Sequence, residues 1–198
     1  MFNSTMGRGA HVLVLAAILP VLIMGMATGC TPRKDRSAQL RGVRMEEIRL
    51  LNRHTGVNDI TMMVPEGFAS EWTRENRFDK FFVYSPADTG QTQRGMLVID
   101  VEPSPIHIIP DTAECERYRG RVADADVIWR ERTITGDAGE RLYQRETMTA
   151  ELFPQSRIRN VSEPVMFHAF VVGSDSILVN RLTAAVETIR FQPLKPNL

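Results

Sequence analysis

Apolar and polar residues alternate along several stretches of the chain with a period of two, which is typical of strands that bury one face. In residues 96–102 the odd-numbered positions are apolar, and Asp100 and Glu102 lie on the opposite side, which we expect to be solvated. Residues 165–172 are apolar on both faces, as expected of a central strand. Four further strands are predicted at 59–64, 78–84, 127–134 and 140–153.

Three other stretches show the spacing of three and four residues between apolar positions that is typical of amphipathic helices. The first is 38–53. The second is 111–123, which begins with Asp111 and Glu114 in the pattern of a capping box. The third follows a turn at residues 173–176 and closes the patterned part of the chain.

Turn residues separate these elements. Pro65 and Gly67 end the strand at 59–64, and a loop with two glycines, 136–139, joins two strands as an antiparallel hairpin. Strands follow one another without the alternation of strand and helix that a parallel sheet requires. The pattern therefore predicts an α+β fold with a mainly antiparallel sheet of about six strands packed with helices.

The longest apolar run of the chain covers residues 12–26. Its 15 residues fall short of the roughly 20 that a membrane-spanning helix needs, and Pro20 interrupts it. The basic residue Arg8 precedes the run, and small residues follow it. Because this is the order of an export signal, we expect residues 1–29 to be a signal peptide.

The end of this run resembles the lipobox of bacterial lipoproteins, in which small residues precede an invariant cysteine. Here Ala27, Thr28 and Gly29 flank the cleavage position before Cys30, with Ala27 where leucine is the usual residue. The resemblance implies that Cys30 becomes the first mature residue, and that acyl chains such as palmitate hold it in a membrane. It also implies a place in the cell envelope, facing the periplasm or the exterior. Thr31, in place of aspartate, favours the outer membrane of a Gram-negative cell.

The remaining 169 of the 198 residues suit one domain. We expect residues 30–56 to form a lipidated tether with the first amphipathic helix, which packs on the domain and leaves its basic face solvated. The alternative is that this basic face rests on an anionic membrane near the anchor. Residues 57–192 then form a single α+β domain, and 193–198 a C-terminal tail.

Composition narrows the classes of function. A chain with 43% apolar and 24% charged residues is typical of a folded globular protein. Because Arg8 is the only Lys or Arg before Cys30, residues 30–198 carry 23 basic against 24 acidic side chains. This balance argues against a nucleic-acid partner, which usually binds a basic excess.

Cys115 is the second of the two cysteines. If Cys30 is acylated, no disulfide can form within the chain, and Cys115 stays a thiol or pairs between chains. On the predicted helix it shares a face with Tyr118 and Val122, so we expect it to be buried as a small apolar side chain.

No arrangement of residues indicates a catalytic, metal or cofactor site. His11, His54, His107 and His168 stand singly, without a second ligand three or four residues away. We expect His168, on a central strand, to be a hydrogen-bonded histidine of the core or sheet. The chain has neither a glycine-rich phosphate loop nor a nucleophile elbow. We therefore predict no catalytic residue, no cofactor and no metal.

A second resemblance concerns the folded part. Residues 64–68 (Val-Pro-Glu-Gly-Phe), Trp72 and the ending at 189–191 (Ile-Arg-Phe) resemble the Mog1/PsbP-like family. That likeness implies an α/β/α sandwich and an accessory protein that docks on a larger assembly. A cystatin-like or NTF2-like roll fits the same order of elements.

These observations favour a non-enzymatic envelope lipoprotein that binds or scaffolds another envelope component. One alternative is a binding protein for a small apolar ligand held between sheet and helices, which a deep apolar cavity would support. The other is an enzyme, for which a cleft converging on His168, His107 and Asp100 would be required.

Overall fold

A computed structural model describes residues 32–34, 36–50, 60–75, 78–85, 94–152 and 165–191, and the side chains of 74–75 and 78–79 lie outside this description. These residues belong to one compact unit, Thr31–Leu198. The predicted signal peptide, its flanking residues and Cys30 lie outside the described residues.

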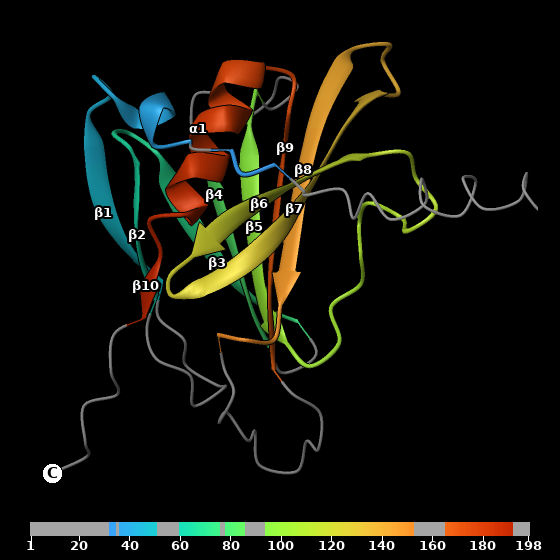
Figure 1. Ribbon diagram of the computed structural model, residues 1–198. Helices are drawn as coiled ribbons and strands as arrows, with labels where there is room; N and C mark the ends of the chain where they lie inside the picture. Colours follow the sequence, from blue (N-terminus) through green and yellow to red (C-terminus); the bar gives the residue numbers. More distant parts are fainter. Residues whose placement is uncertain are drawn as a thin grey trace, which may run out of the picture. The chain divides into compact units, whose positions relative to one another are not determined.

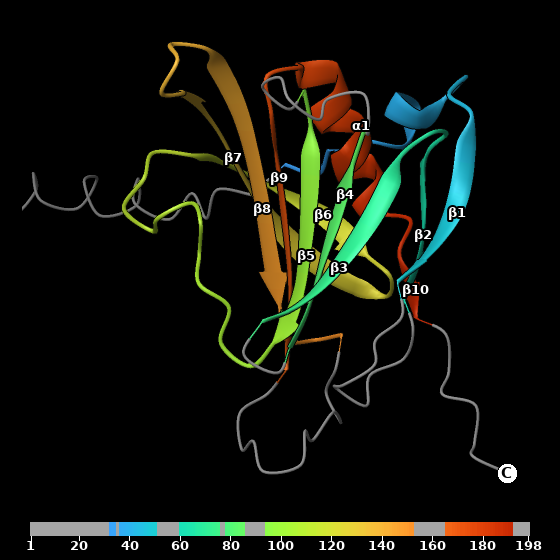
Figure 2. The same ribbon diagram turned by 180° about the vertical axis from the view of Figure 1, so that it is seen from behind.

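Two antiparallel sheets account for most of the described residues (Figure 1). The larger has seven strands in the order β3 (Ala69–Glu75), β4 (Phe78–Tyr84), β5 (Met96–Glu102), β9 (Met166–Gly173), β8 (Arg141–Thr149), β7 (Ala125–Thr135) and β6 (Glu116–Val122). The smaller has three, in the order β1 (Met45–Leu50), β2 (Ile60–Pro65) and β10 (Arg190–Phe191). The large sheet is strongly twisted, and the turn from β6 to β7 reaches the side of β10 in both views (Figures 1 and 2).

All six predicted strands are present. The two strands on either side of residues 136–139, β7 and β8, form the predicted antiparallel hairpin. Gly139 adopts a positive φ of 81°, which explains a glycine at that position of the turn. The antiparallel sheet is therefore confirmed.

One helix, α1 (Ser176–Val186), is present among the described residues. It begins where predicted, because the carboxylate of Asp175 accepts hydrogen bonds from the backbone N–H groups of Ile177 (2.8 Å) and Leu178 (3.2 Å). No helix of the described residues is long and apolar enough to span a membrane.

The core lies between α1, the small sheet and the face of the large sheet that we call the inner face. Register places Ile99, Ala169, Thr147 and Trp129 in one row across this face. Large side chains fill it, including Phe81, Leu97, Ile99, Trp129, Phe167 and Leu182, each no more than 2% exposed. Burial of one such side chain contributes about 1.5–3 kcal/mol, which makes this core the main source of stability.

The helix predicted at 38–53 is wrong. A short 3-10 helix, η1 (Ser37–Leu40), is followed by Gly42 at a positive φ of 73° and by strand β1. Pairing with β2 brings Leu50, which is 2% exposed, opposite Ile60 in the core. Strand pairing with a buried partner outweighs the local helical pattern.

The helix predicted at 111–123 is also wrong, since it holds strand β6. Tyr118 and Val122 are four residues apart, a spacing that places both on one face in a helix and in a strand. Gly120 between them decides the case, because it is buried on the same face with a period of two. Cys115 precedes the strand and is half-buried, so it is not the core residue of a helix. The described unit is therefore largely β with little helix.

Candidate functional site

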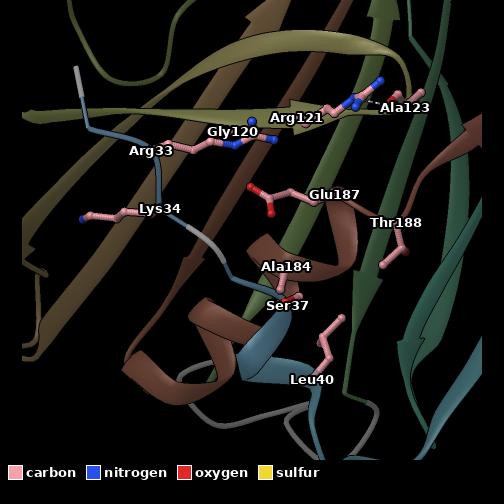
Figure 3. Close-up of a pocket in the computed structure, with 10 residues that line it drawn as sticks. All are labelled: Arg33, Lys34, Ser37, Leu40, Gly120, Arg121, Ala123, Ala184, Glu187 and Thr188. Carbon is pink, nitrogen blue, oxygen red and sulfur yellow. Dashed lines mark hydrogen bonds between the residues drawn. The ribbon is translucent and has the colours of Figure 1, made fainter. Parts of the chain in front are cut away.

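A cavity of about 430 Å³ lies at the C-terminal end of α1 (Figure 3). Three separate parts of the chain line it: the segment before β1, the β6–β7 hairpin and the end of α1. The lining residues are Arg33, Lys34, Ser37, Leu40, Gly120, Arg121, Ala123, Ala184, Glu187 and Thr188.

Backbone pairing brings the first of these segments to the cavity. Arg119 of β6 donates its N–H to the carbonyl of Pro32 (2.8 Å), and the N–H of Lys34 contacts the carbonyl of Arg119 (3.3 Å). Arg33 thus forms an isolated parallel bridge with Arg119. Residues 32–34, which the sequence predicts as tether, cover part of the edge of the large sheet.

A buried ionic cluster holds Arg36, which follows in the same segment. Arg36, 5% exposed, donates hydrogen bonds to Asn180 of α1 (2.8 Å) and to Glu131 of β7 (3.0 Å). Arg145 of β8, 4% exposed, donates to the same two residues. The guanidinium of Arg36 also lies 4.5 Å from the ring centre of Tyr118. One carboxylate, Glu131, therefore links the N-terminal segment to the sheet.

Burial dominates the electrostatics of this cluster. It lowers the pKa of the Arg145 guanidinium from its ordinary value, a change that the charge of Glu131 opposes. Burial also raises the pKa of the Tyr118 hydroxyl well above its ordinary value. Tyr118 is therefore neutral at physiological pH and acts in packing and in the contact with Arg36.

A second cavity of about 630 Å³ adjoins the first, because Ala123, Glu187 and Thr188 line both. Its other walls are the small sheet and the segment after α1, with Glu47, Thr61, Met62, Met63, Asp124, Ile189, Arg190 and Phe191. We call the two cavities together the groove. It follows the end of α1 from η1 to β10 and is open to solvent.

The groove presents charges of both signs. Arg33, Lys34, Arg121 and Arg190 line it together with three carboxylates, Glu47, Asp124 and Glu187. Arg121 is held by Asp124 (3.5 Å) and by the carbonyl of Ala123 (3.2 Å). Such a lining suits a polypeptide with its own mixed charges better than a small apolar molecule.

Gly120 gives the groove part of its depth. A Cβ atom at this position would lie 2.6 Å from the Nε1 atom of Trp129 and 2.7 Å from the Oε1 atom of Glu187. Figure 3 shows the Glu187 side chain extending from the end of α1 toward Gly120. Because Trp129 is completely buried, it has no room to move away, and the position accepts only glycine without a shift.

A second polar cluster lies on the outer face of the large sheet, which is the face opposite α1. The ring of His168 contacts Asp100 through Nδ1 (3.2 Å) and Glu146 through Nε2 (3.0 Å). His107 contacts the other oxygen of Glu146 (3.2 Å). The expectation that His168 is a hydrogen-bonded sheet histidine is confirmed, and its exposed fraction is 1%. The prediction that Asp100 is solvated is wrong, since it is 6% exposed.

Burial disfavours the charged form of His168, but its hydrogen bonds to Asp100 and Glu146, and their charges, raise the pKa to about 8. Burial by itself raises the pKa of Glu146, whereas its partners lower it. The hydrogen bond from His168, the backbone N–H of Ile108 and the two nearby histidines lower its pKa overall. At neutral pH this is a charged histidine between two carboxylates.

A loop closes over this cluster. The N–H groups of Ile108 (2.6 Å) and Ile109 (3.3 Å) donate to Glu146, and Arg130 donates to the carbonyl of Pro110 (2.6 Å). Ile109 is completely buried. His168, His107 and Asp100 therefore converge, but neither cavity of the groove is lined by them, and the arrangement works as a latch for the loop.

From the sequence alone, the alternation of Arg and Glu in β7 and β8 suggests a solvated face. This expectation is wrong for Arg130, Arg145 and Glu146, which are 6%, 4% and 0% exposed. Arg130 pairs with Asp111 (3.1 Å) as well as Glu146 (3.5 Å). No group of three or more metal-binding side chains is present among the described residues.

Sequence patterns did not indicate the groove. The residues around the first cavity come from three segments, 33–40, 120–123 and 184–188, that lie about 60 to 80 positions apart, and their type is ordinary for a surface. One signal in the sequence is Gly120, a small residue between the larger buried residues Tyr118 and Val122. The predicted site residues Ala27, Thr28, Gly29 and Cys30 cannot be compared with it, because they lie outside the described residues.

A scan against protein-family models finds no family that matches the chain, and a search of curated proteins finds no match either.

Proposed function

We propose that the protein is a lipid-anchored, non-enzymatic component of the cell envelope whose folded unit binds another envelope protein in the groove. The observation that carries the proposal is the groove itself: an open depression with charges of both signs, lined in part by residues that lie a few positions after Cys30. An anchor at Cys30 would present this surface to partners at the membrane.

The shape of the groove favours a segment of polypeptide as the ligand. Beside its charges it offers apolar surface from Met63 and Phe191, both partly exposed. A polar rim around an apolar patch is typical of protein interfaces. A small apolar ligand would lie between α1 and the inner face of the sheet. Core side chains of the described residues fill that space, which gives this alternative less support.

The geometry gives less support to an enzyme. The convergence of His168, His107 and Asp100 is covered by the loop that Ile109 anchors. Both ring nitrogens of His168 are engaged by carboxylates, so neither faces a cavity of the groove. A latch of this kind stabilises a loop rather than presenting a base to a substrate.

A finer proposal concerns the fold. We propose that the chain has a Mog1/PsbP-like arrangement, in which an accessory domain docks on an assembly. In support, residues 64–68 form the end of β2 and a turn with Gly67 at a positive φ of 86°, and Trp72 follows in β3. Ile189, in the segment after α1, is buried at 2% exposure.

The anchor is tested by growth with labelled palmitate. The parent chain is expected to incorporate the label, and Cys30→Ser is expected to lose it together with membrane retention. Cys115→Ser is the matched control and should keep both. Label on Cys30→Ser, or none on the parent, would contradict the anchor.

The binding site is tested by a photo-crosslinking residue placed in the groove of the full chain in its own membranes. Arg190, exposed at the groove, should give a defined adduct with one envelope protein, and Thr135, exposed at the other end of β7, should give none. Gly120→Ala, which pushes atoms into the groove, should reduce the adduct at Arg190. Equal adducts at both positions would argue against a specific site.

A further inference from the structure

Strand β6 is an edge strand with one buried face and one exposed face. Tyr118, Gly120 and Val122 are buried on the inner face, whereas Arg117, Arg119 and Arg121 are exposed on the outer face. Successive residues on one face of a strand stand about 7 Å apart. The edge therefore carries a row of three guanidinium groups.

Most of this charge is not neutralised within the described part of the chain. Arg121 pairs with Asp124 at an exposed 3.5 Å contact. Among the described residues, Arg117 and Arg119 form no ion pair, and neither does Arg33, whose Cα is the bridge partner of Arg119. We call Arg33, Arg117 and Arg119 the basic edge.

Apolar side chains are exposed on the same outer face. Ile128, which is 43% exposed, is the cross-strand partner of Arg119. The loop that crosses this face adds Ile108 at 42% and Ile106 at 84%. Cationic side chains beside exposed isoleucines form the kind of surface that lies at the boundary between lipid headgroups and acyl chains.

The position of the basic edge in the chain identifies its occupant. The backbone at Pro32 is fixed to β6, and only Thr31 separates Pro32 from Cys30 in the sequence. Two residues of chain span at most about 7 Å. If Cys30 carries the lipid, which rests on the function proposed above, the edge that Pro32 pairs with cannot lie far from the bilayer surface.

We propose that the basic edge and Ile128 dock the folded unit onto an anionic lipid bilayer. Arg117 and Arg119 then contact lipid phosphates, and Ile128 lies at the headgroup boundary. The attraction of each cation to an anionic surface is electrostatic and falls within a Debye length, so it depends on salt and on lipid charge. Docking fixes the orientation of the unit, while the lipid on Cys30 only retains it.

The test uses the full lipidated chain, with Cys115→Ser, in vesicles of phosphatidylcholine with 30% phosphatidylglycerol. An environment-sensitive fluorophore is attached at Ile128→Cys or, as the matched control, at Thr135→Cys on the same strand. We expect a headgroup-located quencher to reduce the fluorescence at position 128 at least threefold more than at position 135. Vesicles of phosphatidylcholine alone, or high salt, should remove that difference.

The variant R117E/R119E should lose the difference while the protein still floats with the vesicles, and R141E, an exposed arginine at the start of β8, should leave it unchanged. A thermal melt of each variant checks that it folds. If charge reversal disturbs folding, R117Q/R119Q takes its place and should lose part of the quenching difference between positions 128 and 135. Equal quenching at 128 and 135 in the parent would overturn the proposal. So would protection of position 128 in native membranes but not in pure lipid, which would make the edge a protein interface. A parent that does not float would instead contradict the anchor at Cys30.

Discussion

His168 is a charged group that the fold places where almost no solvent reaches. Its pKa of about 8 lies above the ordinary 6.5, so the folded chain binds a proton that the unfolded chain releases between these values. The stabilisation is complete below about pH 6.5 and is lost as the pH rises through 8. Glu146 has a lowered pKa, so its contribution is present above about pH 4.5 and is lost as the pH falls.

Urea unfolding of the chain with Cys30→Ser should therefore show a decrease of about 2 kcal/mol between pH 6 and pH 8.5 from His168, since one pKa unit corresponds to about 1.4 kcal/mol. His168→Gln should abolish that dependence. His107→Gln, which alters a partly exposed histidine, should leave most of it. A stability that rises between pH 6 and 8.5 would contradict the charged cluster.

Glu131 is the second residue on which a buried cluster depends. It accepts hydrogen bonds from both Arg36 and Arg145, which are almost fully buried. Glu131→Gln should destabilise the fold by about 3–5 kcal/mol, because it leaves two buried cations without a counter-charge. The matched control is Glu116→Gln, whose carboxylate is 77% exposed and contacts Lys34. Chemical unfolding of both variants measures the difference, and equal losses would show that the cluster contributes nothing specific.

At the scale of elements, the loop between β5 and β6 has little regular structure but is held by hydrogen bonds to Glu146 and from Arg130. Ile109→Ala should destabilise the chain by about 2–4 kcal/mol, because this fully buried side chain seals the latch over Glu146. Ile106→Ala, at 84% exposure, should change stability by less than about 0.5 kcal/mol. Limited proteolysis should cleave the loop faster in Ile109→Ala only. Unchanged protection would mean that the loop is held by something other than the latch.

The elements that the sequence predicts correctly are those with a clear period of two, such as β5, and those with a capped helical start, such as α1. The errors share one cause. At 111–123 the four-residue spacing of Tyr118 and Val122 suits a helix and a strand equally. At 38–53 the three-residue spacings of Leu40 with Val43 and of Ile48 with Leu51 favour a helix locally. In both stretches long-range pairing decides for the strand. Edge elements such as β3 and β10 carry too few apolar residues to be recognised locally.

The groove and the two ionic clusters are harder to predict, because they depend on register. Arg145 and Glu146 are adjacent in the sequence and point to opposite faces of β8, where they serve different clusters. A shift of one residue would exchange them. The lipidation of Cys30 stays a prediction, and a motif of this kind can be proposed from sequence alone because a processing enzyme reads it as a linear segment, without any fold.

At the scale of the whole molecule, a segment that the sequence predicts as a tether has a structural role. Residues 32–34 pair with the edge strand β6, and Arg36 bonds to α1 and β7. A chain that begins at Thr31 should therefore fold with the stability of the mature protein. A chain that begins at Ser37 should lose about 2–4 kcal/mol, because it gives up the contacts of Arg36 while exposing backbone groups of β6. For a domain of this size the melting temperature should fall by roughly 5–15 °C.

The shorter chain should also self-associate through the freed edge of β6, which light scattering detects as a concentration-dependent increase in mass. Arg36→Gln in the longer chain separates the two effects, since it removes the ionic contact and keeps the backbone pairing of residues 32–34. That variant should lose stability without associating. If the chain that begins at Ser37 melts at the same temperature as the one that begins at Thr31, then the segment before Ser37 is a simple tether, and its pairing with β6 has no consequence for the fold.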